Sequence, residues 1–164
     1  DLYNLMIILS DNTATNILIK LLGGMEEMNG SLAKMGYQTC RVNRLLFDAE
    51  ASDKGIENYV SGIEIADMLE KMYRGKLIDS ASSQEMLEIM KAQRLKNKIP
   101  FYFQGCVPIA HKTGEDDGIT HDVGIIFGSQ PFILCCLGNE TDCPRFNRFI
   151  QKLAWSLYRE TEVS

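Results

Sequence analysis

Residues 10–16 read SDNTATN, a polar stretch between two segments that are mostly apolar. The preceding residues, DLYNLMIIL, stop at this stretch. After it, apolar residues recur with helical spacing up to a glycine pair, at Ala14, Ile17, Leu18, Leu21 and Leu22. The sequence therefore predicts two helices separated by a polar break.

Helical periodicity continues through much of the first hundred residues. Residues 25–35 predict a weaker third helix, and residues 62–75 and 82–93 return to a clear helical pattern. Between these segments, residues 40–61 are richer in charge and glycine than in periodic apolar residues. Irregular stretches of this length inside a compact domain are usually functional or mobile.

The hydrophobic period changes from about residue 107. Residues 107–114, 121–128 and 131–138 are three short runs rich in Val, Ile and Phe, separated by glycine-rich turns. They predict an antiparallel meander of strands. Residues 144–160 have one apolar face and predict a terminal helix that covers the sheet. Helices followed by strands and a covering helix predict an α+β fold.

Length and composition predict one domain over residues 1–164. A chain of this length with 45% hydrophobic residues can bury one sizeable core. We expect residues 1–95 to be mostly helical and residues 96–164 to form the meander and the terminal helix. The formal charge of −5, with acidic and basic residues interspersed, provides no basic stripe for a phosphate backbone, so we expect no nucleic-acid partner.

The cysteines and histidines predict no metal site and no cofactor. Five cysteines are an odd number and lack metal-ligand spacing. They suggest a reducing compartment or an anaerobic host, so a cytoplasmic location is one alternative. His111 and His121 lack a third ligand at suitable spacing, and we expect them to pack at strand ends or to face solvent.

Two polar triplets carry the candidate chemistry. The first is Ser10, Asp11 and Asn12 at the helix break, and the second is Lys112, Thr113 and Gly114 at the end of the first strand. A serine hydroxyl beside a lysine can pass a proton to a leaving amine, and an asparagine amide can hold a substrate carbonyl or amide group. The threonine hydroxyl and the lysine charge can receive a carboxylate, while glycine lets a flat substrate approach the backbone. Together these groups predict a pocket for an amide that bears an anionic group.

In this order and context the triplets resemble those of class A β-lactamases and penicillin-binding proteins. The resemblance extends to LLGG after the first triplet, to CRVNR at the start of the irregular stretch and to HKTG on a strand. It covers nearly the whole chain and implies a β-lactamase/transpeptidase-like fold. The chain resembles the part of the family's sequence that runs from just before the Ser-Asp-Asn loop to the C-terminus. We therefore expect the family's N-terminal strands and central helix to be missing here.

The resemblance also implies a role for each residue of the two triplets. Ser10 would shuttle the proton, and Asn12 would contact substrate and lysine. Lys112, Thr113 and Gly114 would bind the substrate carboxylate and tune Ser10. The backbone N–H of Glu115 would donate to the oxyanion.

Further residues are implied as structural supports of the long loop. Asn16 would brace the loop, and Arg44 and Asn58 would hold its two ends, where the family uses an arginine and an aspartate. Asp11, which precedes a helix, is expected to cap that helix.

Two departures from the family concern the catalytic groups. The family's nucleophile lies in a Ser-x-x-Lys motif before the Ser-Asp-Asn loop, and this chain has no such motif there. Ser31 and Lys34 have the spacing, but they follow Ser10 and lie in a helix that should flank the site, so we reject them. The position two residues after Arg44, where the family has its deacylating glutamate, holds Leu46, which cannot act as a base. Asp48 and Glu50 are expected to be solvated, unless the loop is re-registered to aim one of them inward.

The sequence leaves three functions open. The first is a serine hydrolase related to β-lactamases, which forms an acyl-enzyme with a β-lactam or a related amide that carries a carboxylate. The alternatives are a D-alanyl-D-alanine peptidase of the penicillin-binding type and a non-catalytic binding relative. We expect this chain alone to be inactive, and a retained N-terminal fragment or a second copy to complete its fold. By resemblance its location would be secreted or in the cell envelope.

Overall fold

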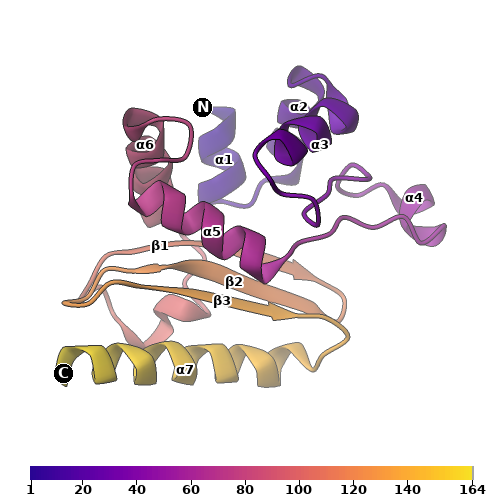
Figure 1. Cartoon of the computed structure of the whole chain (residues 1–164). Coiled ribbons are helices and arrows are strands. Elements are labelled where there is room, and N and C mark those ends of the chain that lie inside the picture. The colour runs from indigo at the N-terminus through magenta and orange to yellow at the C-terminus, as the bar shows by residue number, and fades with distance from the viewer. Residues whose placement is uncertain (164) are drawn as a thin grey trace. The chain divides into compact units, whose positions relative to one another are not determined.

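The computed structural model describes residues 1–163 and has the α+β architecture predicted from the sequence (Figure 1). Its elements in chain order are α1 (Leu2–Ile8), α2 (Asn12–Leu21), α3 (Gly24–Lys34), α4 (Ala49–Asp53), α5 (Gly62–Tyr73), α6 (Ser80–Lys91), the 3₁₀ helix η1 (Ile99–Tyr102), β1 (Ile109–Asp116), β2 (Ile119–Ile126), β3 (Phe132–Gly138) and α7 (Cys143–Val163). The chain divides into two compact units, Asp1–Glu64 and a second unit that begins at Ile65. Between residues 1 and 163, no helix is both long enough and apolar enough to cross a membrane.

The first unit begins with the predicted pair of helices, which the polar break separates. Ala14 and Ile19 are the buried residues of α2. The glycine pair ends this helix because Gly23 and Gly24 both have positive φ angles, +93° and +88°. Glycine adopts this region without the steric cost that a Cβ atom adds.

The stretch 40–61 is held together more closely than its composition predicts. Its two ends pair through an isolated bridge between Arg41 and Tyr59, with reciprocal N–H to C=O hydrogen bonds of 2.9 Å. The five-residue helix α4 lies inside the stretch and is too short to show helical periodicity. The carboxylate of Asp48 caps α4 by accepting a 3.0 Å hydrogen bond from the N–H of Ala51.

The second unit is built on the predicted meander. The strands form an antiparallel sheet in the order β1-β2-β3. Side chains alternate between the two faces of such a sheet, so Ile109 and its cross-strand neighbours Ile126 and Phe132 lie on the same face.

That face carries the main core of the second unit. Figure 1 shows α7 running along one side of the sheet. Ile150 and Ala154 of α7 are fully buried and pack with Ile109, Ile126 and Phe103 in one hydrophobic cluster. Removing an isoleucine side chain from water contributes roughly 2 kcal/mol, so this cluster is a principal source of stability for the unit.

Candidate functional site

Ser10 is presented at the break between α1 and α2 in a strained conformation. Its φ angle is +55°, which is uncommon for a residue other than glycine. The N–H groups of Leu9 and Asp11 both donate to the carbonyl of Leu5, at 3.2 and 3.1 Å, and these bonds close the end of α1 around Ser10. A residue in this region costs about 1–3 kcal/mol, and such strain tends to concentrate at functional sites.

The two residues after Ser10 begin α2. Asp11 is the N-cap, because its Oδ1 accepts a 2.7 Å hydrogen bond from the N–H of Ala14. This carboxylate therefore serves the helix. Asn12 is the first residue of α2, so it is fixed immediately beside Ser10 on a rigid element.

Asn16 of α2 holds the long loop through the backbone of Leu46. Its Oδ1 accepts from the N–H of Leu46 and its Nδ2 donates to the carbonyl of Leu46, both at 2.9 Å. A single side chain thus binds both the backbone N–H and the backbone carbonyl of Leu46. The loop is attached to the helix that begins at the Ser-Asp-Asn break, and the residue at the attachment point is aliphatic.

The two ends of the loop are joined by side chains from both directions. The Oδ1 of Asn58 accepts from the N–H groups of Asn43 and Arg44 at 2.8 and 3.0 Å, and its Nδ2 donates to the carbonyl of Arg44 at 3.2 Å. Arg44 also forms an ion pair with Glu57, at 2.7 Å. Hydrogen bonds from Arg44 lower the pKa of Glu57. This ion pair was not predicted from the sequence, because nothing in the spacing distinguishes Glu57 from the other acids of the loop.

A second missed acid fixes the start of the loop. Glu64, in the first turn of α5, accepts hydrogen bonds from the N–H groups of Gln38, Thr39 and Cys40 at 3.0, 2.8 and 2.7 Å. These bonds lower the pKa of Glu64 to about 2, and the bond from Cys40 is the largest cause. The carboxylate therefore binds three consecutive backbone groups in its ionised form.

The Lys-Thr-Gly triplet lies within β1, which extends two residues beyond Gly114 instead of ending there as expected. Lys112 is half-buried, and its Nζ donates to the carbonyl of Thr113 at 2.6 Å. Burial lowers the pKa of Lys112 to about 8, against the opposing charge of Asp122, which raises it. Lys112 therefore changes charge close to neutral pH, as groups at functional sites often do.

The backbone of Glu115 points away from β2. The N–H of Phe127 donates to the carbonyl of Pro108, so these two residues face each other as a hydrogen-bonded pair. Hydrogen-bonded and non-bonded pairs alternate along an antiparallel ladder, and Glu115 is seven residues, an odd number, after Pro108. The pair of Glu115 and Thr120 is therefore a non-bonded one. Among the described strands β1 pairs only with β2, so the amide of Glu115 faces the outer edge of the sheet.

Lys98 binds the backbone of the triplet and was not identified from the sequence. Its side chain is fully buried, and its Nζ donates to the carbonyls of Gly114 and His121 at 3.1 and 2.9 Å. It also forms a 3.0 Å ion pair with the exposed carboxylate of Glu115. A lysine in the loop sequence NKIP gives no signal of burial, because lysine is almost never fully buried without a partner.

His111 differs from its expected place at a strand end. It is buried inside β1, and its Nδ1 lies 2.9 Å from Oδ1 of Asp122, which is also fully buried. The other oxygen of Asp122 accepts a 2.9 Å hydrogen bond from the N–H of Ile99. Asp122 thus connects β2, β1 and the start of η1, next to Lys98.

The other candidates considered from the sequence are exposed or have other partners. Ser31 and Lys34 are both exposed on α3. Asp48 caps α4, and Glu50 forms an exposed ion pair with Lys54 at 2.6 Å. Residues 1–163 contain no group of three or more His, Cys, Asp or Glu side chains that could hold a metal ion.

All five cysteines are free thiols. Burial raises the pKa of Cys135 and of Cys136 to about 11, so both stay protonated at neutral pH. Cys106, by contrast, is exposed.

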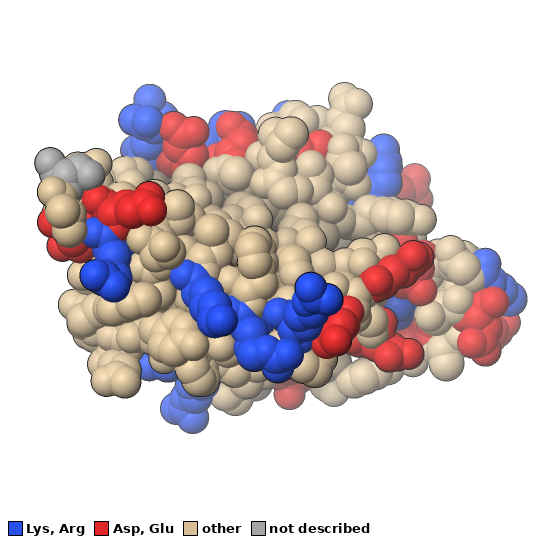
Figure 2. Space-filling view, turned by 90° about the horizontal axis from the view of Figure 1, so that it is seen from below, with Lys and Arg blue, Asp and Glu red and all other residues tan. Residues whose placement is uncertain are grey.

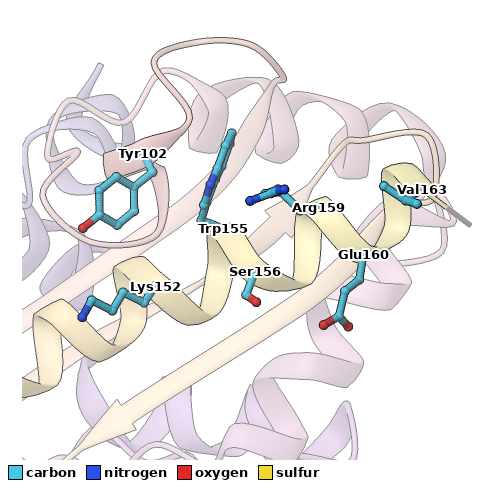
Figure 3. Close-up of a pocket in the computed structure, with 7 residues that line it drawn as sticks. All are labelled: Tyr102, Lys152, Trp155, Ser156, Arg159, Glu160 and Val163. Atoms are coloured by element: carbon cyan, nitrogen blue, oxygen red, sulfur yellow. The ribbon is translucent and has the colours of Figure 1, made fainter.

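A hollow lined largely by α7 on the second unit lies away from the triplet. It has a volume of about 880 Å³ and is lined by Tyr102 and by α7 (Figure 3). The labelled α7 residues are Lys152, Trp155, Ser156, Arg159, Glu160 and Val163. α7 covers the face of the sheet on which the side chain of Ile109 lies. Lys112 is three residues later on β1, so its side chain lies on the opposite face. The hollow and Lys112 are therefore on different sides of the sheet.

The outer face of α7 carries a short basic row. Arg145, Arg148 and Lys152 are exposed and recur with helical spacing, and Figure 2 shows basic side chains in a row here with acidic ones nearby. Three charges on one helix are fewer than the phosphate contacts of a typical nucleic-acid interface.

The predicted site residues therefore form two groups. Ser10, Asp11, Asn12 and Asn16, together with the loop ends Arg44 and Asn58, belong to the first unit. Lys112, Thr113, Gly114 and Glu115 are consecutive on one strand of the second unit. Each group is held by its own hydrogen bonds.

Solved structures with the same fold include PBP-A and β-lactamases. PBP-A is 26% identical with a TM-score of 0.87, and the match covers 99% of this chain and 61% of PBP-A. A mutant of PBP-A, solved as an acyl-enzyme complex with penicillin G, matches with a TM-score of 0.88 at the same identity and coverage. A class A β-lactamase representative from Bacteroides cellulosilyticus is 21% identical, with a TM-score of 0.85 over 99% of this chain and 63% of that one, a likeness of fold.

The chain thus spans slightly more than three fifths of the length of these structures. The family profile Beta-lactamase2, described as the beta-lactamase enzyme family, matches residues 1–161. These findings confirm the family resemblance and the fold that the two triplets predicted. The chain belongs to the beta-lactamase enzyme family.

Proposed function

We propose that these residues form the Ser-Asp-Asn and Lys-Thr-Gly part of a serine hydrolase that acts through an acyl-enzyme. Its substrate is a β-lactam or a related amide that bears a carboxylate. The nucleophilic serine is expected in a Ser-x-x-Lys motif outside residues 1–164. Within these residues, Ser10 carries the proton to the leaving nitrogen, and Asn12 binds the amide or carbonyl group of the substrate.

The second unit contributes the binding of the anionic group. Lys112 and Thr113 receive the carboxylate, Gly114 leaves room for the flat substrate, and the outward amide of Glu115 donates to the oxyanion. The strained φ of Ser10 and the lowered pKa of Lys112 support this assignment, because both are features of reactive sites. The assignment requires the hydroxyl of Ser10 and the ammonium of Lys112 to meet across one cleft.

We further propose that release of the acyl group is slow, as in a penicillin-binding peptidase. The observation that carries this choice is the binding of Leu46 by Asn16. The loop residue that α2 holds in place is aliphatic and cannot activate water. The nearby acids Asp48 and Glu50 are engaged in a helix cap and in an exposed ion pair, so neither replaces the missing base.

The test is the lifetime of the adduct between the full-length protein and a fluorescent penicillin. After a short incubation and removal of free reagent, intact-mass spectrometry follows the loss of the added mass. We expect an adduct that persists for many minutes. Rapid loss would support a β-lactamase instead, and the absence of any adduct would support the non-catalytic binding relative.

A further inference from the structure

A second cavity of about 480 Å³ lies in the second unit between the end of α6, the η1 segment and the start of β1. We call it the α6–η1 cavity. It is lined by Lys91, Gln93, Lys96, Pro100, Phe101, Phe103, Gln104, Gly105, Val107, Pro108, Ile109 and His111. Its volume is within the range of about 300–1,000 Å³ that small-molecule sites have.

About half of the cavity wall is apolar. Phe103 and Ile109 are buried parts of the core, and Phe101 contributes a ring that is 50% exposed. Val107 and two prolines complete this surface. An apolar ligand body of the size of one aromatic ring would remove the exposed parts of Phe101 and Val107 from water, which favours binding.

The charged side chains that line the cavity are both lysines. Two lysines, Lys91 and Lys96, line it, and no aspartate or glutamate does. Lys91 is ion-paired with the exposed Glu88 at 2.8 Å, while Lys96 is an exposed residue of the loop after α6. The cavity therefore favours a ligand that carries a negative charge.

His111 and Gln93 supply fixed polar groups, each only 1% exposed. The Oε1 of Gln93 accepts from the N–H groups of Arg94 and Leu95 at 2.8 and 3.0 Å, which fixes its orientation. Nδ1 of His111 is held by Asp122, so the imidazole ring cannot turn freely. Buried polar groups with fixed orientation are what gives small-molecule sites their specificity.

From this combination we propose that the α6–η1 cavity binds a small organic carboxylate with an aromatic or similarly compact apolar body. The carboxylate pairs with Lys96, and the apolar body lies against Phe101 and Val107. The site is separate from the proposed acyl-enzyme site, whose carboxylate contacts are Lys112 and Thr113. His111 directly precedes Lys112 on β1, so an occupied cavity contacts the strand that carries the triplet.

The experiment titrates the full-length protein with benzoate, using the uncharged benzamide as the comparison. Trp155 is the only tryptophan, and the centroid of its ring lies 5.3 Å from the ring centroid of Phe103, which lines the cavity. Binding should therefore change Trp155 fluorescence, and it should shift the ring signals of ¹³C-labelled His111 in NMR spectra. We expect saturation with benzoate at concentrations below about 10 mM, and weaker binding of benzamide.

Variants separate this cavity from the triplet. Lys96→Glu should weaken benzoate binding by about tenfold, because it replaces attraction by repulsion at an exposed position. Phe101→Ala should weaken benzoate and benzamide alike. Lys76→Glu makes the same charge change on an exposed residue outside the cavity and should leave binding unaltered.

Thr113→Val tests the alternative that benzoate occupies the triplet. Binding that survives this change and is reduced by Lys96→Glu supports the proposal. Binding that is lost in Thr113→Val and intact in Lys96→Glu would overturn it, as would an absence of saturation with either ligand. None of these outcomes depends on turnover, so failure here is distinct from failure of the proposed hydrolase function.

Discussion

The side-chain amide of Asn16 binds both the N–H and the carbonyl of Leu46, thirty residues away, with two hydrogen bonds of 2.9 Å. An amide is the side chain suited to this task, because it offers an acceptor and a donor in fixed relation. One residue of α2 thereby fixes the position of Leu46 in the loop.

Replacing Leu46 by glutamate should accelerate release of the penicilloyl group from the full-length protein. A carboxylate at this fixed position could act as a general base towards water, an effect worth roughly 10²–10⁴-fold in favourable geometry. We expect at least about tenfold faster loss of the adduct, measured by intact-mass spectrometry. Leu46→Gln has similar size and polarity without the base and should not accelerate release; equal acceleration by both variants would contradict the explanation.

Replacing Asn16 by alanine should destabilise the loop. Two hydrogen bonds with a net worth of about 1 kcal/mol each are lost, so we expect a loss of about 2 kcal/mol in the free energy of unfolding in urea. Hydrogen exchange should increase at the amide of Leu46. Asn29→Ala is the matched control, because Asn29 binds Val42 in the same reciprocal way, at 2.8 and 2.9 Å, and its loss should leave Leu46 protected.

Acylation of the full-length protein should weaken as the pH rises through about 8. The pKa of Lys112 is lowered from its ordinary 10.5 because burial disfavours the charged form, so the folded protein loses this proton first. The cation that would hold the substrate carboxylate is present below pH 8 and absent well above it. The measurement is the second-order rate of penicillin acylation between pH 6 and 10.

Lys112→Arg serves as the comparison for that profile, because arginine keeps its charge throughout this range. Its acylation rate is expected to be lower overall and independent of pH near 8. A decline at the same pH in the arginine variant would assign the titration to another group.

Asp122→Asn should lower both the free energy of unfolding and the pKa of Lys112. The substitution weakens the contacts with His111 and with the N–H of Ile99 in a fully buried position, and hydrogen bonds to charged groups contribute about 1.5–3 kcal/mol. We therefore expect urea unfolding to show a loss of about 2–3 kcal/mol. The carboxylate also raises the pKa of Lys112, so its removal should bring that pKa below 8, which NMR of ¹³C-labelled lysine can measure. Asp116→Asn, at an exposed position of β1, should change neither quantity appreciably.

The outer edge of β3 should pair with another strand. Among residues 1–163 its only strand neighbour is β2, and its sequence FILCCLG contains no charged residue or proline to protect the edge. We propose that a second copy or an N-terminal fragment covers it. Sedimentation velocity of residues 1–164 alone should show dimers or larger species that Leu137→Lys reduces and that Gln130→Lys, in the turn before β3, does not. A monomer at all concentrations would refute this.

The sequence predicts what depends on local chemistry. The helical spacing around Ala14 and Leu18, the run of strands after residue 107 and the position of Asp11 before a helix each follow from neighbours within a few residues. The two triplets could be found in the same way, because their order and context resemble those of a known family. The fold class and the family were accessible from these signals.

The supporting residues depend on contacts between distant parts of the chain and were missed. Lys98 reaches Gly114 and His121, and Asp122 reaches back to Ile99, across separations of 16 to 23 residues. Periodicity cannot predict such pairs, since it reports only which face of an element is apolar. A charged residue that is buried by its partners looks the same in sequence as one that faces solvent.

Cys106 is the exposed thiol of the five, since Cys40 and Cys136 are buried and Cys135 and Cys143 are partly buried, so it is the preferred point of chemical modification. Maleimides react with thiolates, and the raised pKa values of Cys135 and Cys136 keep both thiols protonated and unreactive, whereas Cys106 is exposed. Cys106 also directly precedes Val107, which lines the α6–η1 cavity. A dye attached there would report from the rim of that cavity, without the introduction of a new cysteine.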